Sequence, residues 1–429
     1  MSGVNKVAAI RRSSIGRSYI LAPTVKRPAW PSGRGPRRLR QWSSVSKDSA
    51  SVVIIGAGIV GCSVAYHLAA RGCADVIILE KADTEVTGST ARSAAGVRHQ
   101  FANETNIRLS IYSIERLKRF QEEVGGYSGL KQIGYLLLVS DEPTWRQYRT
   151  SVELQNSLGV ASRTLTIDEI RAMIPMANLD GLLGATFCPA DGHCDPHGVA
   201  TGYLAAAIAR GVELRRATPA TGFRMKCGRV IAVDTPQGVI RCETVVNAAG
   251  PWAGRVGALA GLAIPVEPYR RCIYMTEPTS HTGVPFTIDT SSGFYIRPEG
   301  EKLLIGVTNE NEPPGENFAV DWEWMETVLE RGSARFPFLA DTGIVRRNCW
   351  AGLYENTPDH NPILGRHPHL PNYVDASGFS GHGVMHSPAT GMLIAEEILD
   401  GRAHSINIDE LRVTRFLAGR ETRGESNVY

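Results

Sequence analysis

VVIIGAGIVG, residues 52–61, followed by Glu80 at the end of a second hydrophobic run, is the stretch that decides the fold. The first run reads as a buried strand, the glycines as a tight turn and the residues after them as a helix. In a dinucleotide-binding βαβ unit, Gly56 allows the turn, Gly58 lets the backbone approach a pyrophosphate and Gly61 lets the helix pack close to the strand. Glu80 can accept hydrogen bonds from ribose hydroxyls. The stretch therefore predicts a dinucleotide site rather than a glycine-rich turn without a ligand.

Charge is unevenly distributed along the 429 residues. Eleven of the 46 Lys and Arg residues precede Asp48, the first acidic residue, which leaves 35 basic against 43 acidic residues and a net charge of −8 for the remainder. A net acidic body argues against a nucleic-acid partner. The length allows two domains, or one large core with insertions.

The basic segment 1–47 is rich in Arg and Ser and lacks acidic residues, as mitochondrial transit peptides do. We therefore expect a disordered targeting segment and a protein of the mitochondrial matrix, with association to the inner membrane left open. The alternative is a disordered basic tail without a targeting role. The eight cysteines lie scattered without paired spacing, which suits reduced thiols in such a compartment.

Local signals also place helices and turns further along the chain. Asn103 is expected to cap a helix that reaches residue 123, and residues 166–169 read as a capping box. DGHCDPH, residues 191–197, has the residue types of a metal cluster, but its Asp-Gly and Asp-Pro pairs favour a turn that starts a helix over residues 197–210. We expect no metal site.

VVNAAGPW, residues 245–252, repeats the pattern of the first motif: an apolar strand, a turn of small residues and then a helix. Residues 264–307 read as β-rich segments separated by Pro and Gly. Helix–strand alternation at both ends of the chain around this β-rich middle predicts an α/β fold, α+β overall. It consists of a Rossmann-like dinucleotide-binding domain with an inserted, mainly antiparallel β substrate domain. We assign residues 50–130, 195–262 and 345–420 to the first domain, and residues 131–194 and 263–344 to the second.

Motifs that span the chain carry a resemblance to a known family. They are GAGIVG (56–61) with Glu80, GSTARSAAGVRHQF (88–101), NAAGPW (247–252) and the C-terminal pair WAGLYENTPDHNPILG (350–365) and SGFSGHGVMHSP (377–388). Together and in this order they resemble the D-amino-acid oxidase / sarcosine oxidase superfamily of FAD-dependent oxidoreductases. The sarcosine-oxidase-β-like and dimethylglycine-dehydrogenase-like members are the most similar in character. The mitochondrial FAD-dependent oxidoreductase-domain-containing branch, associated with assembly of respiratory complex I, also looks similar.

The resemblance implies FAD rather than NAD. It implies that the pyrophosphate binds at the first glycine turn, the adenosine ribose at Glu80 and adenine at the backbone of Ala220. The pyrimidine end of the flavin would lie at residues 381–385, where the N–H groups of a helix N-terminus stabilise negative charge on the reduced ring. The cofactor-binding residues that it implies are Gly56, Ala57, Gly58, Ile59, Val60, Gly61, Glu80, Lys81, Ser89, Thr90, Arg92, Ser93, Ala95, Gly96, Ala220, Ala249, Gly250, Trp252, Gly381, His382, Gly383, Val384 and Met385.

Departures from the family pattern are equally informative. Some members attach the flavin through a histidine at the position of Ser93, and monomeric sarcosine oxidases use a cysteine at the position of Gly352. Neither residue can form those bonds, so the resemblance implies noncovalent FAD. Met385 and Leu304 stand where those oxidases have a substrate-binding lysine and an oxygen-activating lysine. The second difference favours a dehydrogenase over an oxidase.

The resemblance implies an FAD-dependent amine or amino-acid dehydrogenase or oxidase. It would oxidise the C–N bond of a secondary amine or N-alkyl amino acid, of the sarcosine, dimethylglycine or proline class, by hydride transfer to flavin. The catalytic candidates are His382, Tyr295 and Arg98, and His99, Arg270 and Arg271 are further candidates for substrate contacts. Oxygen, an electron-transfer flavoprotein and a quinone all stay open as electron acceptors. The alternatives are a flavin-binding assembly factor for respiratory complex I and oxidation of a hydroxy acid or polyol.

Overall fold

The hydrophobic run at residues 52–55 forms most of β1 (Ser49–Ile55), the central strand of an eight-stranded sheet that we call sheet 1. A computed structural model of the chain describes residues 47–417 and 424–425. The expected targeting segment lies, except for Lys47, outside the described residues. Within residues 47–429 the described part of the chain forms one compact unit.

Sheet 1 has the strand order β17-β18-β11-β1-β2-β8, with β10 and β9 attached at β11. The strands from β18 to β8 in this order run parallel, whereas β17, β10 and β9 are antiparallel additions. Besides β1, the strands are β2 (Val76–Leu79), β8 (Glu213–Arg215), β9 (Gly222–Lys226), β10 (Arg229–Thr235), β11 (Gly238–Asn247), β17 (Ile363–His367) and β18 (Leu370–Ser377). The parallel core of this sheet is the Rossmann-like part of the fold.

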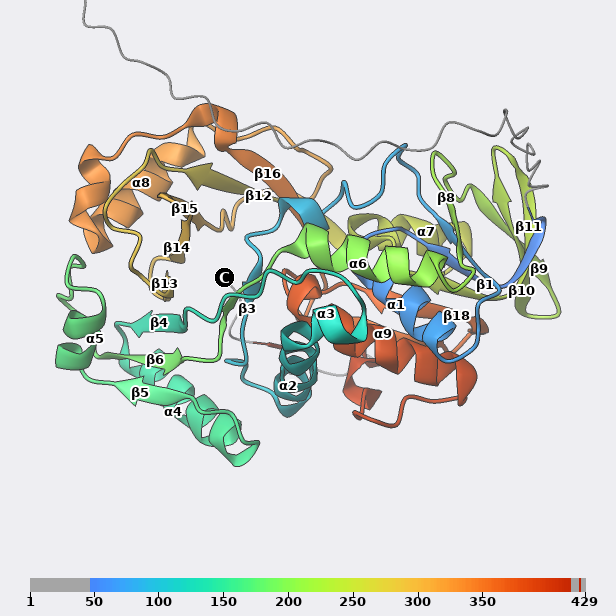
Figure 1. Cartoon of the computed structure of the whole chain (residues 1–429), viewed down its shortest axis with the longest axis horizontal. Helices are drawn as coiled ribbons and strands as arrows, with labels where there is room; N and C mark the ends of the chain where they lie inside the picture. Colours follow the sequence, from blue (N-terminus) through green and yellow to red (C-terminus); the bar gives the residue numbers. More distant parts are fainter. Residues whose placement is uncertain (1–46, 418–423, 426–429) are drawn as a thin grey trace, which may run out of the picture. The chain divides into compact units, whose positions relative to one another are not determined.

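Burial on both faces explains the unbroken hydrophobic sequence of β1, because parallel sheets are covered by structure on each side. Val52 and Ile54 face a core formed with the helices α1 (Ile59–Ala70), α6 (Pro196–Ile208) and α9 (Gly383–Leu399). Val53 and Ile55 pack on the opposite face, against the strands β10, β11 and β18. Helix α1 packs against both α6 and α9 (Figure 1).

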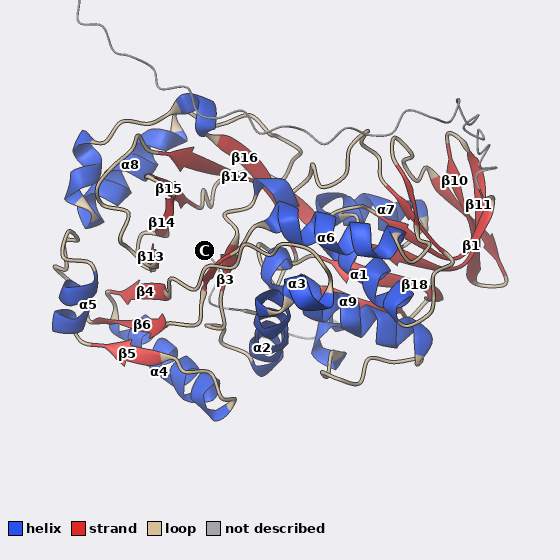
Figure 2. Cartoon of the chain, viewed as in Figure 1, coloured by secondary structure: helices blue, strands red, loops and turns tan. Residues whose placement is uncertain are grey.

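A second eight-stranded sheet, sheet 2, has the order β16-β12-β15-β14-β13-β4-β6-β5. All of its neighbouring strands are antiparallel except β13 and β4. Figure 2 shows its strands gathered apart from those of sheet 1. The strands are β4 (Tyr135–Val139), β5 (Arg163–Leu165), β6 (Gly184–Cys188), β12 (Glu267–Met275), β13 (Phe286–Asp289), β14 (Phe294–Glu299), β15 (Lys302–Val307) and β16 (Trp350–Asn356).

The remaining elements connect and cover the two sheets. They are the two-stranded pair β3 (Gly96–Val97) and β7 (Gly192–His193), and the helices α2 (Glu104–Lys118), α3 (Phe120–Glu123), α4 (Glu142–Ser157), α5 (Ile167–Met173), α7 (Ala253–Leu259), α8 (Trp324–Arg335) and α10 (Thr414–Leu417). Buried side chains of α5 and α8 complete the core under sheet 2. Among the described residues, no helix combines the length and the hydrophobicity that a membrane span requires.

Several local predictions are confirmed. Asn103 caps α2 by accepting a hydrogen bond from the backbone of Asn106 at 2.8 Å, although the helix stops at Lys118 and a separate turn, α3, follows. Thr166 and Glu169 form the expected capping box of α5. Asp195 accepts hydrogen bonds from the first backbone N–H groups of α6, so the 191–197 stretch does start a helix.

The predicted fold class, a Rossmann-like α/β part with a mainly antiparallel β part, is confirmed. The chain crosses between the sheets several times, since sheet 1 takes its strands from residues 49–79, 213–247 and 363–377. Strand β16, within the segment 345–420 assigned to the first domain, pairs with β12 of sheet 2. The division of the chain into two domains stays a prediction.

Candidate functional site

A cavity of about 640 Å³ opens at the carboxyl ends of β1, β2 and β11 and reaches sheet 2. Gly56, Glu80 and Ala248, which follow these three strands, line it, as do Tyr295 and Val307 from sheet 2. Ligands of open α/β sheets bind at the carboxyl edge of the parallel strands, where the chain turns away to both sides. The volume of the cavity lies within the range of small-molecule and cofactor sites.

The first glycine turn is packed too tightly for any side chain. A Cβ at Gly61 would overlap the carbonyl oxygen of Gly56, and a Cβ at Gly56 would overlap that of Ala248. Gly56 also has φ of +107°, a left-handed conformation that favours glycine. The turn therefore brings the start of α1 directly against β1 and β11.

The N-terminus of α1 points its backbone N–H groups at the cavity without a competing acid. Gly58 is the N-cap residue and provides no side-chain cap, and the first turn contains no acidic residue. The backbone N–H of Ile59 donates to Thr90 Oγ1 at 3.1 Å, which ties the 88–94 loop to the helix. A helix N-terminus of this kind attracts phosphate oxygens.

Glu80 is held in a defined position at the end of β2. One carboxylate oxygen accepts the backbone N–H of Ala57 at 3.0 Å, and the other accepts that of Ala82 at 2.9 Å. Each oxygen has further lone pairs for a ligand. The acid predicted from the sequence thus lies in the cavity wall beside the glycine turn.

The 88–94 loop is fastened to strand β16 across the cavity wall. Ser89 Oγ donates to the carbonyl of Leu353 at 2.6 Å, and Arg92 Nη1 donates to that of Ala351 at 3.2 Å. In return the indole N–H of Trp350 donates to the carbonyl of Arg92 at 2.9 Å. These contacts join sheet 1 to sheet 2 along one side of the cavity.

A second helix N-terminus, that of α9, also borders the cavity. Gly381, Gly383 and Val384 line it, and α9 starts with no side-chain cap and no acid in its first turn. Gly381 has φ of +97°, and a Cβ there would meet the ring of Tyr354. The arrangement leaves backbone N–H groups of a 17-residue helix available to an electron-rich ligand group.

Glu355 places a carboxyl group between this helix and the 247–252 turn. Its Oε2 accepts the backbone N–H of Gly378 at 3.3 Å, and a Cβ at Gly383 or Gly250 would lie 3.6 Å from one of its carboxyl oxygens. Burial raises the pKa of Glu355 to about 7, against the opposing effect of backbone N–H groups. The cavity wall therefore contains a carboxyl group that changes charge near neutral pH.

Sheet 2 supplies mostly neutral side chains to its end of the cavity. Ile273, Tyr295 and Val307 line it, together with Tyr354. The ring of Tyr295 lies over Gly306, where any Cβ would overlap it, and burial strongly raises the pKa of this phenol. Besides the carboxyl group of Glu355 on β16, sheet 2 supplies the cation of Arg271 to the cavity lining.

Most residues predicted to bind the cofactor line this single cavity, and Tyr295 of the catalytic candidates lines it as well. The predicted residues in the wall are Gly56, Gly58, Ile59, Val60, Glu80, Lys81, Ser89, Thr90, Arg92, Ser93, Ala220, Ala249, Gly250, Trp252, Gly381, Gly383 and Val384. Their individual roles stay predictions.

Other predicted residues lie outside the wall. Ala57, Gly61, Ala95, Gly96, His382 and Met385 are not among the lining residues, and neither is Arg98. Gly61 has a packing role, as described above, and His382 is the N-cap residue of α9. Burial, followed by the positive charge of Arg98, lowers the pKa of His382 well below its usual range.

Arg98 lies buried between backbone and ring groups. Its Nη1 donates to the carbonyl of Gln100 at 3.0 Å, its Nη2 lies 3.4 Å from Nε2 of His382, and its guanidinium covers the ring of Phe101 at 4.5 Å. His99, another substrate candidate, hydrogen-bonds Asp191 through Nδ1 at 2.6 Å. The fold therefore places neither of these two candidates in the cavity wall.

Asp191 does lie near two other potential metal ligands, His99 and Cys188, but neither of them belongs to the 191–197 stretch. Donor atoms of His99, Cys188 and Asp191 all lie within 4.8 Å of one another. The 2.6 Å contact between His99 and Asp191 is a hydrogen bond, closer than two ligands of one ion normally approach. The expectation of no metal stays a prediction.

The lining residues that were not singled out in the sequence include Arg255, Glu316, Phe318 and Glu355. Glu355 stands inside the WAGLYENTPDHNPILG motif, so its place in that motif was a usable signal. Glu316 and Phe318 lie between β15 and α8 in a stretch without periodicity, and only the fold brings them to the cavity. Arg255 on α7 forms an ion pair with Glu316.

Comparisons with known proteins identify the family. The family described as FAD dependent oxidoreductase (DAO) matches residues 51–397, and the chain belongs to it. Mouse mitochondrial sarcosine dehydrogenase is 31% identical over 372 residues, which cover 83% of this chain but 40% of the mouse protein. FAD-dependent oxidoreductase domain-containing protein 1 of Xenopus laevis is 30% identical, with 86% of this chain and 83% of the frog protein covered. The chain thus spans less than half of the sarcosine dehydrogenase that it matches.

Solved structures agree with this assignment. L-proline dehydrogenase from P. horikoshii superposes with a TM-score of 0.81 at 32% identity, covering 87% of this chain and all of that chain. Glycine oxidase from Geobacillus kaustophilus gives a TM-score of 0.75 at 26% identity, covering 86% and 99%.

FAD is the cofactor of the family, and the residues present fit it. The uncapped N-terminus of α1 and the glycine turn suit a pyrophosphate, and Glu80 suits a ribose. The uncapped N-terminus of α9 suits the electron-rich end of a flavin ring. The predictions of FAD and of the superfamily are confirmed.

Proposed function

We propose that this chain oxidises the C–N bond of a secondary amine or N-alkyl amino acid of the sarcosine, dimethylglycine or proline class. The observation that carries the proposal is the single cavity that runs from the glycine turn, past the N-terminus of α9, to Arg271 and Tyr295 of sheet 2. It offers room for a small substrate beside a dinucleotide. Bound FAD would accept a hydride equivalent from the carbon next to the neutral nitrogen, leaving an iminium product.

The residues of the chain would orient the substrate and exclude water. Ile273, Val307 and the ring of Tyr295 form an apolar wall in sheet 2, which favours a neutral amine over an ammonium ion. Glu355, with its pKa raised to about 7, holds or releases a proton at the wall near neutral pH. Removing the amine proton before hydride transfer requires such an acceptor or bulk water.

Three sequence positions support a noncovalent cofactor and an acceptor other than oxygen. Ser93 and Gly352 both line the cavity, and neither side chain can form the covalent flavin bonds of the related oxidases. Leu304, at the position of an oxygen-activating lysine in those oxidases, is fully buried with Ile273 and Met275. A cation is thus missing at that position, so we expect an electron-transfer flavoprotein or a quinone to accept the electrons.

The test is anaerobic reduction of the flavin. The purified FAD-loaded protein should lose its visible flavin absorbance on addition of at least one of sarcosine, dimethylglycine, proline or a D-amino acid. Denaturation should then release all of the FAD, as expected for noncovalent binding. Absence of bleaching by every substrate would overturn the proposal.

A second function, assembly of respiratory complex I with FAD in a structural role, is favoured by one observation. The chain covers 83% of the frog FAD-dependent oxidoreductase domain-containing protein 1, but 40% of mouse sarcosine dehydrogenase. Co-purification with complex I subunits, together with no bleaching, would support this function over the first. The basic segment 1–47 and the mitochondrial relatives support a mitochondrial location for either, which imaging of the full-length protein with a C-terminal tag would test.

A further inference from the structure

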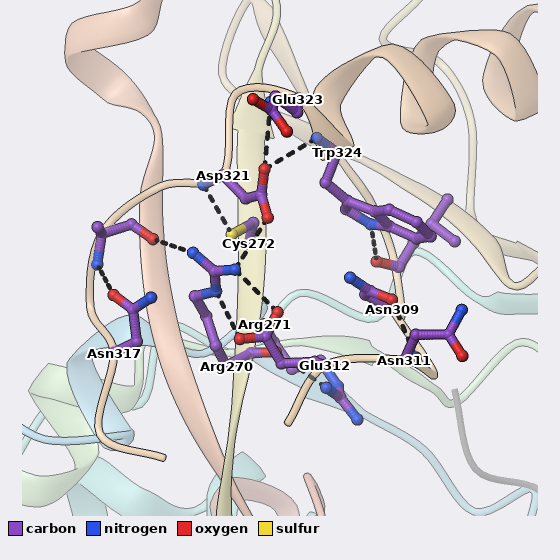
Figure 3. Close-up of polar contacts among 12 residues, drawn as sticks. Arg270, Arg271, Cys272, Asn309, Asn311, Glu312, Asn317, Asp321, Glu323 and Trp324 are labelled. Carbon is purple, nitrogen blue, oxygen red and sulfur yellow. Dashed lines mark hydrogen bonds and ion pairs between the residues drawn. The ribbon is translucent and has the colours of Figure 1, made fainter. Parts of the chain in front are cut away.

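Glu312 and Glu355 are both buried beside β12, and their surroundings are opposite. Arg270 of β12 donates to both carboxylate oxygens of Glu312 at 2.9 Å, and it also donates to Asp321 at 2.8 Å. Figure 3 shows these contacts around the guanidinium of Arg270. The negative charge of Glu312 is therefore neutralised within the fold.

Glu355 has no such counter-ion. Among residues 47–417 and 424–425, no Lys, Arg or His forms an ion pair with its carboxyl group, which meets the backbone N–H groups of Gly378 and Phe379 instead. Burial raises the pKa of Glu355 to about 7, and these N–H groups oppose the rise. A small change in the charge around this carboxyl group is therefore enough to move a proton onto it or off it.

The backbone holds Glu355 close to the segment that leads into α9. The N–H of Ser380 donates to the carbonyl of Glu355 at 3.0 Å, and the N–H of Thr357 donates to Ser380 Oγ at 3.2 Å. A Cβ at Gly378 would overlap the side chain of Thr357, so the two segments pack without a gap. The end of β16 and residues 378–382 thus form one tightly packed unit.

This position matters because the N-terminus of α9 suits the electron-rich end of a flavin ring. Gly250, Gly383 and Glu355 all line the cavity, and a Cβ at either glycine would lie 3.6 Å from a carboxyl oxygen of Glu355. Reduction adds negative charge to the ring, which the helix N-terminus stabilises. A second negative charge at the same N-terminus is unfavourable, so a reduced ring favours the neutral form of the carboxyl group.

Other groups on the elements packed against Glu355 do not take over this role. Burial lowers the pKa of His382, the N-cap residue of α9, well below its usual range, so the imidazole stays neutral. Burial also raises the pKa of the Tyr354 phenol, which stays neutral as well. On β12, Pro268 stands opposite Glu355, and the charge of Arg271 acts on Tyr354 and not on Glu355.

We propose that the carboxyl group of Glu355 takes up a proton when the bound flavin is reduced, which couples proton uptake to electron uptake. Two electrons and one proton enter the ring, and a second proton passes from the solvent to the carboxylate of Glu355. The oxidised amine supplies the two electrons and the first proton in turnover, and dithionite with a proton from the solvent supplies them in the test. Because only the cofactor is involved, this coupling is independent of which substrate the chain oxidises.

The test is a reductive titration of the FAD-loaded protein with dithionite and reference dyes at a series of pH values, without any amine. Each proton taken up with two electrons changes the equilibrium constant for reduction tenfold per pH unit, or about 30 mV. Just above pH 7, where the carboxylate of the oxidised protein is charged, we expect two protons and a slope of about 60 mV per pH unit. A one-proton slope in this range would overturn the proposal.

Two buried carboxyl groups give a matched pair of variants. Glu355→Gln should show the one-proton slope, and its reduction potential above pH 7 should exceed that of the unmodified chain, because a negative charge beside the ring is removed. Asp375 is the control, since its pKa is also raised to about 7 but it does not line the cavity. Asp375→Asn should keep the two-proton slope. Equal slopes in Glu355→Gln and the unmodified chain, or a one-proton slope in Asp375→Asn, would overturn the proposal.

A second measurement needs no variant at Glu355. The infrared difference spectrum between the reduced and oxidised forms of the unmodified protein, recorded just above pH 7, should gain a band of a protonated carboxyl group and lose carboxylate bands. Asp375→Asn should retain this change. A spectrum without the protonated carboxyl band would overturn the proposal, even if Glu355→Gln failed to fold or to bind FAD.

Failure of the proposed function has a different signature, because the potential is measured without an amine. A two-proton slope that depends on Glu355, with no bleaching by any amino acid, would keep the role of Glu355 and remove the oxidation. Bleaching by an amine, with a one-proton slope in the same protein, would keep the oxidation and overturn the role of Glu355.

Discussion

The walls at the two ends of the cavity consist of different kinds of protein groups. At sheet 1 the wall consists largely of main chain: the glycine turn at residues 56–61, the N-terminus of α1 and the N-terminus of α9. At sheet 2 it consists of side chains that project from separate strands, such as Arg271 from β12, Tyr295 from β14 and Tyr354 from β16. The first end suits a cofactor shared by a whole family, and the second suits a substrate that differs between members.

The difference teaches how each end tolerates change. A main-chain wall depends on the absence of side chains and on close packing, so a single added methyl group blocks it. A side-chain wall depends on which residue stands at each position, so substitutions there alter what binds and leave the cofactor in place. Four predictions test this contrast, starting with the largest expected effect.

Gly61→Ala should remove bound FAD and destabilise the protein by about 5 kcal/mol or more, because the added Cβ overlaps the backbone oxygen of Gly56, which cannot move away. The measurements are flavin content after purification and urea unfolding. Gly283→Ala is the matched control, since a Cβ there meets nothing within 4 Å. If the purified Gly61→Ala protein contained its full amount of FAD, the cavity wall at sheet 1 would not depend on close packing of the main chain.

Arg270→Gln should lower the free energy of unfolding by about 4 kcal/mol, because Glu312 and Asp321 would lose their shared counter-ion in a partly buried setting. Arg271→Gln should lower it by less than about 1 kcal/mol, because no carboxylate partner is lost. Urea unfolding of both variants decides the comparison. If Arg271→Gln were the more destabilising substitution, Arg271 would have a structural role, and the contrast between the two arginines of β12 would be wrong.

Glu355 should make stability fall as pH rises. Its folded pKa of about 7 lies above the ordinary value of 4.5, so its contribution is complete below about pH 4.5 and is lost between that value and about pH 7. The loss amounts to about 3 kcal/mol, and Glu355→Gln should not show it. Unfolding of both proteins between pH 4.5 and 8 gives the difference. The pKa of Asp375 is also raised to about 7, but it affects the stability of both proteins equally and therefore cancels in the difference between them. Parallel curves for the two proteins would contradict the burial of this carboxyl.

Trp252→Leu should have the smallest effect, although Trp252 lies in the wall at the sheet 1 end. Lys81 Nζ lies 3.1 Å from the centre of the indole ring, a cation–π contact worth at most about 1 kcal/mol at a partly exposed site. The affinity for FAD should therefore fall about fivefold at most, as measured by fluorescence titration of the FAD-free protein. Lys81→Met should have a similar effect, and the double variant should add little to it. A hundredfold loss would mean that a side chain, and not the main chain, dominates this end.

Much of the first end was predictable because its signals are local. The glycines at 56, 58 and 61 and the acid at Glu80 predicted strand, turn, helix and strand, and the structure places the turn and the acid in one wall. The glycines act through the backbone of their own segment, and Glu80 stands at the end of the next strand along the chain, where its carboxylate reaches the backbone of Ala57. Resemblance to the family then identified the cofactor.

The second end was predictable only in part. Tyr295 was a candidate and lines the cavity, whereas Arg98 was a candidate and lies outside it. Arg270 and Arg271 stood as equal candidates, because two neighbouring arginines look the same in a sequence. Their difference depends on residues 312–321, which fold back over β12, where Glu312 and Asp321 form ion pairs with Arg270 and not with Arg271.

By itself the sequence determined the Rossmann-like unit, the glycine turn and the identity of the family, because backbone conformation and packing distance are decided by residues a few positions apart. Only the tertiary structure decided which charged side chains face the cavity and which are neutralised elsewhere. That choice depends on strand pairing, as where Arg271 stands opposite Gly352 of β16, and on loops with no pattern of their own. Side-chain partners separated by 40 residues or more along the chain, such as Arg270 and Glu312 or Asp321, are set by the fold as a whole.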